Sequence, residues 1–243
     1  MKGWIAAGGL VAGYAALHRA GHRWGATLEE LVSPMPGDEL IRSPKTRTMH
    51  AITIDAPPAA VWPWLVQMGY HRAGWYTYPW VDRYVWHIEN PSADAVIEGL
   101  QTLGVGDTVP DGEPGTAFYV VAGIDPPNTL VLRSTSHVPE PLRGRMWIDW
   151  TWAFSLTPEG DGRTRLRVAV RATYGPWFAR PLMEGLVVPS DFVMAGSMLR
   201  GLRRRAEGRP TRGDRADSRT RSSKMNVLQP GPWTPFSDNH KWW

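Results

Sequence analysis

The sequence contains no cysteine among its 243 residues. A disulfide framework, a thiolate metal site and a cysteine nucleophile are therefore all excluded. It also lacks a G-x-S-x-G nucleophile elbow, a phosphate-binding loop, a dinucleotide-binding G-x-G-x-x-G and an H-E-x-x-H metal motif. From these absences we expect neither a cofactor nor a bound metal.

Net positive charge is confined to one stretch, although the chain as a whole carries a net charge of +4. Residues 203–224 contain nine basic and three acidic residues, a net charge of +6, which leaves −2 for the rest. A nearly neutral body disfavours nucleic acid as a partner of the folded part. The composition after residue 207 predicts a disordered basic tail at 208–243.

No apolar run reaches the ~20 residues of a membrane-spanning helix. The longest, Gly3–Leu17, has fifteen residues without charge. We expect residues 1–23 to form a short uncleaved anchor that contacts the membrane through residues 1–17. A signal peptide, or an apolar helix on a soluble cytoplasmic domain, are the alternatives. Arg19 and Arg23 favour a cytoplasmic domain.

His18 and His22 in the same segment have the i, i+4 spacing of a helical metal-ligand pair. A third ligand is missing nearby in the sequence, so we interpret both histidines as solvated residues beside the membrane.

The strongest structural signal is period-two alternation over residues 147–174, interrupted by a Pro/Gly turn at 157–162. Large apolar side chains share one face, and four arginines share the other. The pattern predicts an antiparallel hairpin with one dry and one solvent-exposed face. Asp149 has the parity of the arginines, so we expect an ion pair with Arg165 or Arg167.

Further strand-like runs precede this hairpin, at residues 48–54, 105–109, 116–124 and 129–136. Helices are expected over residues 59–68 and, as one or two short pieces, within 80–103. Residues 24–46 contain three prolines and predict an irregular connector, in which Thr27 and Glu30 have capping-box spacing.

Helical spacing follows the hairpin. Phe178, Leu182 and Leu186 are four residues apart, and a second apolar series runs to Leu202. We expect one long helix, kinked or divided at Pro189, that covers the dry face of the sheet. The predicted fold is α+β of the helix-grip type: a curved antiparallel sheet wrapped around a long C-terminal helix, with two short helices after the first strand.

Short motifs at several points support this fold, at residues 54–58, 61–69, 74–76, 105–107, 125–127, 130–132 and 191–194. In these motifs the sequence resembles the SRPBCC superfamily (START/Bet v 1-like, polyketide cyclase/dehydrase-like). Residues 24–27 and 36–38 resemble an uncharacterised membrane-associated branch of it. The resemblance covers about residues 24–207, and we take 47–207 as the domain. It implies a deep cavity for an apolar ligand, but it does not specify an activity.

The cavity would lie between the dry face of the sheet and the helix. Its expected lining is Trp150, Trp152, Phe154, Val168, Val170, Tyr174, Phe192, Met194 and Met198, with Ser134 as a polar anchor. Its expected mouth is His71, Arg72, Trp75 and Tyr76. The alternative is that these aromatic side chains fill a solid core.

The sequence identifies no clear catalytic residue. His50 has the parity of inward-facing neighbours, and Tyr174 lies on the dry face, so these two are the only candidates. A hydrogen-bonded core histidine is the alternative for His50.

Two functions of different classes follow. The first is binding or transport of an apolar small molecule or lipid by a membrane-tethered domain. The second is a cyclase or dehydratase acting on a polyketide-like substrate, which needs an acid–base pair inside the cavity. A chaperone-like interaction domain is a third possibility.

Overall fold

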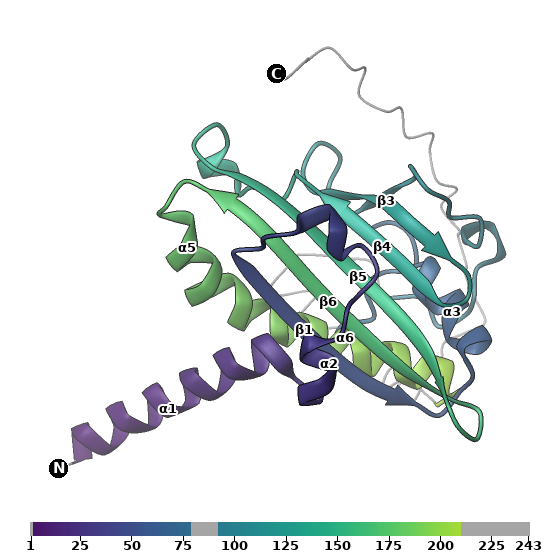
Figure 1. The fold of residues 1–243 in the computed structure, drawn as a ribbon, viewed down its shortest axis with the longest axis horizontal. Coiled ribbons are helices and arrows are strands. Elements are labelled where there is room, and N and C mark those ends of the chain that lie inside the picture. Colours follow the sequence, from purple (N-terminus) through teal and green to yellow (C-terminus); the bar gives the residue numbers. More distant parts are fainter. Residues whose placement is uncertain (1, 79–91, 210–243) are drawn as a thin grey trace, which may run out of the picture. The chain divides into compact units, whose positions relative to one another are not determined.

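A computed structural model describes residues 2–78 and 92–209, with side chains from residue 8 onward. Its centre is a six-stranded antiparallel sheet with the strand order β1-β6-β5-β4-β3-β2 (Figure 1). The strands are β1 (Thr46–Ile54), β2 (Thr108–Pro110), β3 (Phe118–Asp125), β4 (Thr129–Ser134), β5 (Trp147–Glu159) and β6 (Arg163–Gly175).

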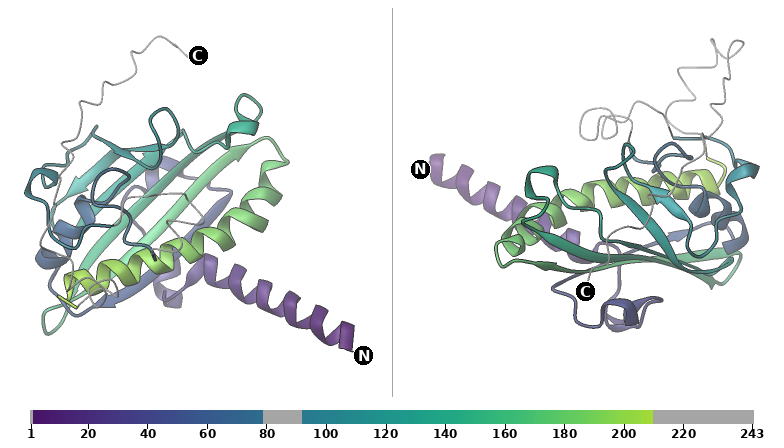
Figure 2. Two further views of the ribbon diagram at one scale, coloured as in Figure 1. Left: turned by 180° about the vertical axis from the view of Figure 1, so that it is seen from behind. Right: turned by 90° about the horizontal axis from the view of Figure 1, so that it is seen from above.

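The helices surround this sheet. They are α1 (Lys2–Arg23), α2 (Leu28–Val32), η1 (Asp38–Ile41), α3 (Pro58–Val66), η2 (Glu98–Leu100), η3 (Glu140–Leu142), α5 (Ala179–Leu182), η4 (Met183–Val187) and α6 (Val188–Ala206). The last three form one continuous helix along one face of the sheet (Figure 2). The predicted α+β helix-grip arrangement is confirmed. Of the two short helices expected after β1, α3 is present; in the second region, 80–103, residues 80–91 lie outside the described residues and the remainder contains the short helix η2.

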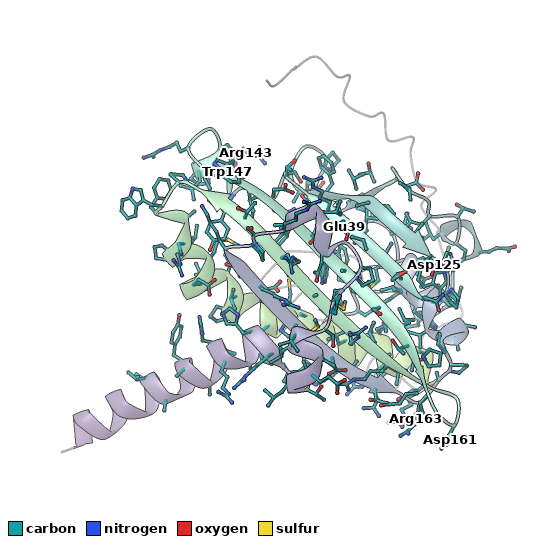
Figure 3. The ribbon with its side chains drawn as sticks, in the orientation of Figure 1. Glu39, Asp125, Arg143, Trp147, Asp161 and Arg163 are labelled. Atoms are coloured by element: carbon teal, nitrogen blue, oxygen red, sulfur yellow. The ribbon has the colours of Figure 1, made fainter. Side chains whose placement is uncertain are left out.

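The β5–β6 hairpin has the predicted register. Trp152 pairs with Val170, and Phe154 pairs with Val168. Figure 3 shows Asp161 and Arg163 at the hairpin turn and Trp147 at its opposite end. The apolar face of this hairpin packs against α6 in the main core, because large side chains at alternate positions all point to the same side.

The opposite face of the sheet is not simply solvent-exposed, which corrects the predicted wet face. The connector of α2 and η1 lies across it (Figure 2), and Met35 of the connector packs on Met49, Ala153 and Ala169 of the sheet. Arg171 is only 9% exposed, because its guanidinium donates to the carbonyl oxygens of η1 and the residue after it.

Two further predictions concern the polar contacts of this face of the sheet, and one of them was wrong. The capping box of Thr27 and Glu30 is confirmed, but Glu30 also forms an ion pair with Arg165 at 2.8 Å. Asp149 instead pairs with Arg133 of β4, through two bonds of 2.7 and 2.9 Å. The register explains this, because Arg165 lies opposite Thr157, far along the strand from Asp149.

The long helix changes its hydrogen-bonding pattern just before Pro189. Residues Met183–Val187 form a π-helical turn, and Pro189 occupies the first turn of α6. Proline has no N–H to donate to the preceding turn, so the irregularity expected at Pro189 lies immediately before it.

Helix α1 extends away from the sheet, and only its C-terminal end packs against the body (Figure 1). All residues from 8 to 16 are exposed, including Leu10 at 78% and Val11 at 70%. Among the described residues, the helix that is long and apolar enough to cross a membrane is Ala179–Ala206 rather than α1. That helix is the cover of the sheet, which explains its apolar face.

Candidate functional site

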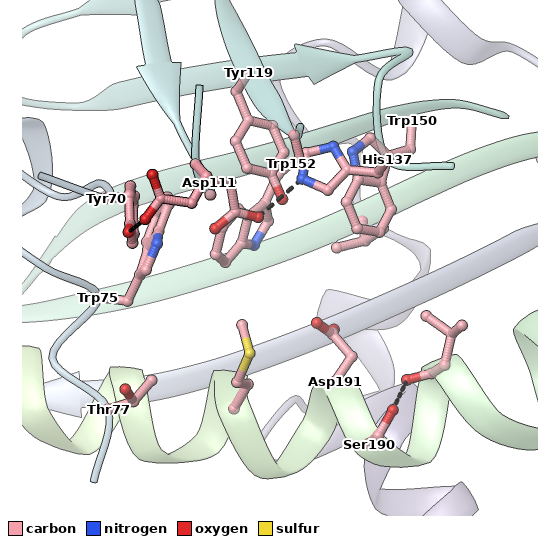
Figure 4. Close-up of a pocket in the computed structure, with 16 residues that line it drawn as sticks. Tyr70, Trp75, Thr77, Asp111, Tyr119, His137, Trp150, Trp152, Ser190 and Asp191 are labelled. Carbon is pink, nitrogen blue, oxygen red and sulfur yellow. Dashed lines mark hydrogen bonds and ion pairs between the residues drawn. The ribbon is translucent and has the colours of Figure 1, made fainter. Parts of the chain in front are cut away.

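A cavity of about 410 Å³ lies between the sheet and the long helix. Its apolar walls are the indoles of Trp75, Trp150 and Trp152, together with Val170 and Met194. Figure 4 shows the aromatic side chains on the sheet side and the side chains of α6 on the opposite side. The register places Trp152 directly beside Val170 on neighbouring strands, so these residues form one continuous wall.

Five of the residues predicted for the cavity or its mouth meet in this lining: Trp75, Trp150, Trp152, Val170 and Met194. Three others, Phe154, Val168 and Met198, are at most 1% exposed and pack in the solid core further along the sheet. The aromatic face is therefore divided between a filled core at one end and a cavity at the other.

Three predicted cavity residues lie elsewhere. Tyr174 belongs to a second core cluster under α5, and its hydroxyl is 2.8 Å from the Thr46 hydroxyl. Phe192 faces the other side of α6 and packs on Trp24 and His50. Ser134 is buried behind the lining, where it contacts His137.

The other three predicted mouth residues have structural contacts. Arg72 donates to the carbonyl oxygens of Val66 and Met68 at the end of α3. Tyr76 is buried, and its hydroxyl donates to the Trp64 carbonyl oxygen. His71 is exposed and its ring packs on Tyr70. None of the three lines the cavity.

His50 is buried between the sheet and α1, away from the cavity. Its Nε2 donates to the Gly21 carbonyl oxygen at 2.7 Å, and burial lowers its pKa below the ordinary value. It is therefore a neutral histidine that fastens α1 to β1, as the structural interpretation of this residue expected.

Apart from Ser134, the polar part of the cavity is built from residues that the sequence did not single out as site residues. His137 Nε2 lies 2.8 Å from an oxygen of Asp111, and His137 Nδ1 lies 2.7 Å from the Ser134 hydroxyl. The Ser134 oxygen also accepts the N–H of Ser136 at 3.1 Å. Because a carboxylate accepts, His137 carries its proton on Nε2 when neutral, and Ser134 donates to Nδ1.

Two more ionisable groups complete this end of the cavity. Burial, and then the nearby charge of Asp111, raise the pKa of Tyr119 well above its ordinary value, so this residue keeps its proton and can donate. Asp191 reaches from α6 toward the sheet (Figure 4). Burial, and then the nearby charge of Asp111, raise the pKa of Asp191 to about 7.

The cavity walls also contain two hydrogen-bond donors without a protein acceptor. The indole Nε1 atoms of Trp75 and Trp150 are buried and have no partner among the described residues. Buried N–H groups are normally paired, because an unpaired one costs about 1–3 kcal/mol. Two unpaired donors thus belong to residues that line the cavity, although the two nitrogen atoms themselves have almost no exposed surface.

Of the ionisable residues of the cavity, one could have been predicted from the spacing of the sequence. Asp191 has the helical spacing of Ala195, Met198 and Leu202, which are all buried against the sheet, so it lies on the apolar face of α6. Asp111 and His137 lie in loops after β2 and β4. Loop residues follow no periodicity, so nothing in the sequence brought them together.

No protein-family model matches the chain, and no curated protein matches it. Solved structures do match. A protein from Mesorhizobium loti is 17% identical and covers 68% of this chain and 100% of its own, with a TM-score of 0.40. The Aha1 dimer from Colwellia psychrerythraea is 16% identical and covers 67% and 96%, with a TM-score of 0.40.

A truncated norcoclaurine synthase from Thalictrum flavum also matches. It is 10% identical and covers 65% of this chain and 91% of its own, with a TM-score of 0.40. At these identities and TM-scores the matches give no functional information. Any function of this chain therefore has to follow from its own cavity.

Proposed function

We propose that this protein binds an apolar, multi-ring small molecule that carries acceptor oxygens. The observation that carries the proposal is the pair of unpartnered indole N–H groups of Trp75 and Trp150, two residues in the apolar part of the cavity wall. Apolar walls with a few directed polar groups are typical of small-molecule sites. A purely hydrocarbon ligand would leave both donors unpaired, so a carbonyl or ether oxygen near each indole is favoured.

Two three-ring probes of similar size and shape, 9,10-anthraquinone with two carbonyl oxygens and anthracene with none, test this proposal by titration calorimetry. We expect the quinone to bind more tightly. Trp150→Phe should weaken quinone binding by about 3- to 10-fold, which corresponds to one hydrogen bond, and should leave anthracene binding nearly unchanged. Equal affinities for both probes, insensitive to Trp150→Phe, would contradict the role of the indole donors.

A filled cavity provides the control. Val170→Trp should prevent binding of both probes, because it occupies the space between the sheet and α6. Native mass spectrometry of protein purified from cells then asks whether a ligand co-purifies. Failure of both probes to bind, together with the absence of a co-purified ligand, would rule out the binding function.

A second candidate function is acid–base conversion of such a ligand, of the cyclase or dehydratase kind. The specific observation is the Asp191 carboxyl, whose pKa is raised to about 7, across the cavity from Tyr119 (Figure 4). A base with a pKa near 7 is suited to removing a proton next to a carbonyl group, while Tyr119 or an indole donates to the carbonyl oxygen.

Proton transfer can be tested without the natural substrate. In deuterated buffer, the protein should catalyse deuterium incorporation next to the carbonyl of 1-tetralone, followed by NMR. The rate should rise with pH with a midpoint of about 7, and Asp191→Asn should abolish it. Exchange at the buffer rate in the native protein would eliminate the enzymatic candidate and leave the binding function untouched.

Attachment to a membrane through residues 1–17 is part of the proposal. Its support is the run of exposed, mostly apolar residues from Gly8 to Ala16 in α1, which includes Leu10 at 78% and Val11 at 70% exposure. An apolar helix of this kind is stabilised by a lipid surface.

A further inference from the structure

A histidine–carboxylate cluster lies where α1 meets the long helix, away from the cavity. His18 and His22 are one turn apart on α1, and Glu184 lies in the π-helical turn η4. His22 Nε2 is 3.0 Å from Glu184 Oε2, and His18 Nε2 is 3.8 Å from the same oxygen. The three ligand atoms all lie within 4.8 Å of one another.

The hydrogen bonds of His22 fix which nitrogen is available. His22 Nδ1 is 3.0 Å from the Arg47 carbonyl oxygen, which can only accept, so Nδ1 carries the proton. In neutral His22 the Nε2 lone pair then points at a carboxylate oxygen 3.0 Å away. Two acceptors at this distance repel each other unless a cation or an extra proton lies between them.

Hydrogen bonds also orient the Glu184 carboxylate. Glu184 Oε1 accepts the Thr46 hydroxyl at 2.6 Å, and Thr46 is itself 2.8 Å from the Tyr174 hydroxyl. This network directs the other oxygen, Oε2, toward the two histidines. Outer hydrogen bonds that orient each ligand are typical of metal sites in proteins.

We propose that His18, His22 and Glu184 bind a divalent transition-metal ion of the zinc class, with a fourth position open. Ligands at about 2.1 Å around a tetrahedral centre are about 3.4 Å apart, and the distances of 3.0 and 3.8 Å to Glu184 lie on either side of that value. Two histidines and one carboxylate are a donor set that zinc accepts.

Such an ion would join α1 to the body of the domain. The histidines belong to the partly exposed end of α1 that packs against the body, where Gly21 lies so close to Val188 that an added Cβ would be 2.8 Å from the Val188 carbonyl oxygen. The exposed apolar part of α1 ends at Ala16, two residues before His18. The metal would therefore fix the direction in which that part leaves the domain.

The test uses the full chain without a polyhistidine tag, stripped with EDTA and titrated with Zn²⁺. We expect one equivalent to bind, and a hundredfold excess over its Kd to raise the Tm by about 5–10 °C. Co²⁺ in place of Zn²⁺ should give the intense visible absorption of a four-coordinate site.

His18→Ala is the decisive variant, because at 3.8 Å His18 makes no hydrogen bond to Glu184. It should weaken Zn²⁺ binding at least about 100-fold and leave the Tm of the metal-free protein unchanged. Glu184→Gln keeps an acceptor for Thr46 and should also lose the metal. His71→Ala removes an exposed histidine elsewhere and should bind Zn²⁺ normally.

Two results would overturn the site. One is the absence of a Zn²⁺-dependent rise in Tm in the native chain, which would identify the cluster as an ion pair between protonated His22 and Glu184. The other is binding of equal strength in the native chain and in His18→Ala, which would place the ion elsewhere.

Discussion

At the scale of single residues, Asp191 is a carboxyl whose surroundings raise its pKa. It lies on the apolar face of α6 and lines a cavity walled by indoles. Burial disfavours its charged form, and Asp111 across the cavity disfavours it further, which together raise the pKa of Asp191 to about 7. Such a group changes charge within the physiological range, so it links pH to both stability and ligand binding.

We predict a pH-dependent contribution of Asp191 to stability. The pKa of the folded state exceeds the ordinary value of 3.8, so the folded protein binds more protons between about pH 4 and pH 7. The unfolding free energy therefore falls as the pH rises through this window. Asp191→Asn should remove that fall and stabilise the protein at pH 8 by on the order of 2 kcal/mol.

Urea unfolding at pH 5 and pH 8 measures this effect. Asp161→Asn, in the exposed hairpin turn, is the matched control and should keep the pH dependence of the native protein. An equal loss of stability between pH 5 and pH 8 in the native protein and in Asp191→Asn would show that another group is responsible.

At the scale of elements, the cavity exists because α6 approaches the sheet and its neighbouring loop closely at one end and not at the other. A Cβ added at Gly201 would lie 1.9 Å from the backbone carbonyl oxygen of Tyr76. Leu199 and Leu202, on either side of this glycine, are buried in the filled core. Toward its N-terminal end, α6 presents Ser190, Asp191 and Met194 to the cavity instead.

We predict that Gly201→Ala disrupts this contact. The new methyl group meets backbone that cannot move independently, so the variant should lose at least about 2 kcal/mol of unfolding free energy. It should also weaken anthraquinone binding, because Trp75 and Thr77, on either side of Tyr76, line the cavity.

Gly196→Ala on the same helix is the control. Its Cβ would meet the end of the flexible Arg200 side chain at 3.2 Å, and alanine favours a helix by up to about 1 kcal/mol. Urea unfolding followed by circular dichroism measures the unfolding free energy of both variants. Gly201→Ala should be clearly less stable than Gly196→Ala. Equal effects would mean that the close approach at Gly201 is unimportant.

The connector also acts at this scale. Residues 24–45 pass over the arginine-bearing face of the sheet and turn a two-layer arrangement into three layers at its centre (Figure 2). Arg165 holds Glu30 and the Gly25 carbonyl oxygen, and Arg171 holds η1. The arginines thus attach the connector by directed bonds, rather than only keeping that face soluble.

At the scale of the whole molecule, a run of consecutive exposed residues that are mostly apolar, 8–16, lies on α1. We predict that deletion of residues 1–17 moves the protein from the membrane to the soluble fraction of lysed cells. The Tm should change little, because residues 8–16 are exposed and Tyr14, whose hydroxyl donates to the Gly185 carbonyl oxygen, makes the hydrogen bond that joins them to the body. Ultracentrifugation followed by immunodetection measures the distribution.

A double substitution of Leu28 and Val32 to serine is the matched control for this deletion. Both side chains are at least 75% exposed on α2, so the variant removes exposed apolar side chains without touching α1. It should keep the native distribution between fractions. An unchanged distribution after deletion of residues 1–17 would contradict the anchor.

The sequence by itself determined the strands, the hairpin register and the long helix. These features depend on side-chain periods of two and about 3.6 residues, which are local properties of the chain. The same periods correctly placed Trp150 and Trp152 opposite α6. They did not show how far the helix stands from the sheet at each point, so Phe154 and Val168 were expected in the cavity although they fill the core.

Only the tertiary structure decided the chemistry. Asp111 and His137 come from two loops that meet because β3 lies between β2 and β4 in the sheet. Glu184 joins His18 and His22 from more than 160 positions away in the chain. Contacts of this kind depend on how the elements close in three dimensions, and local periodicity carries no information about that closure.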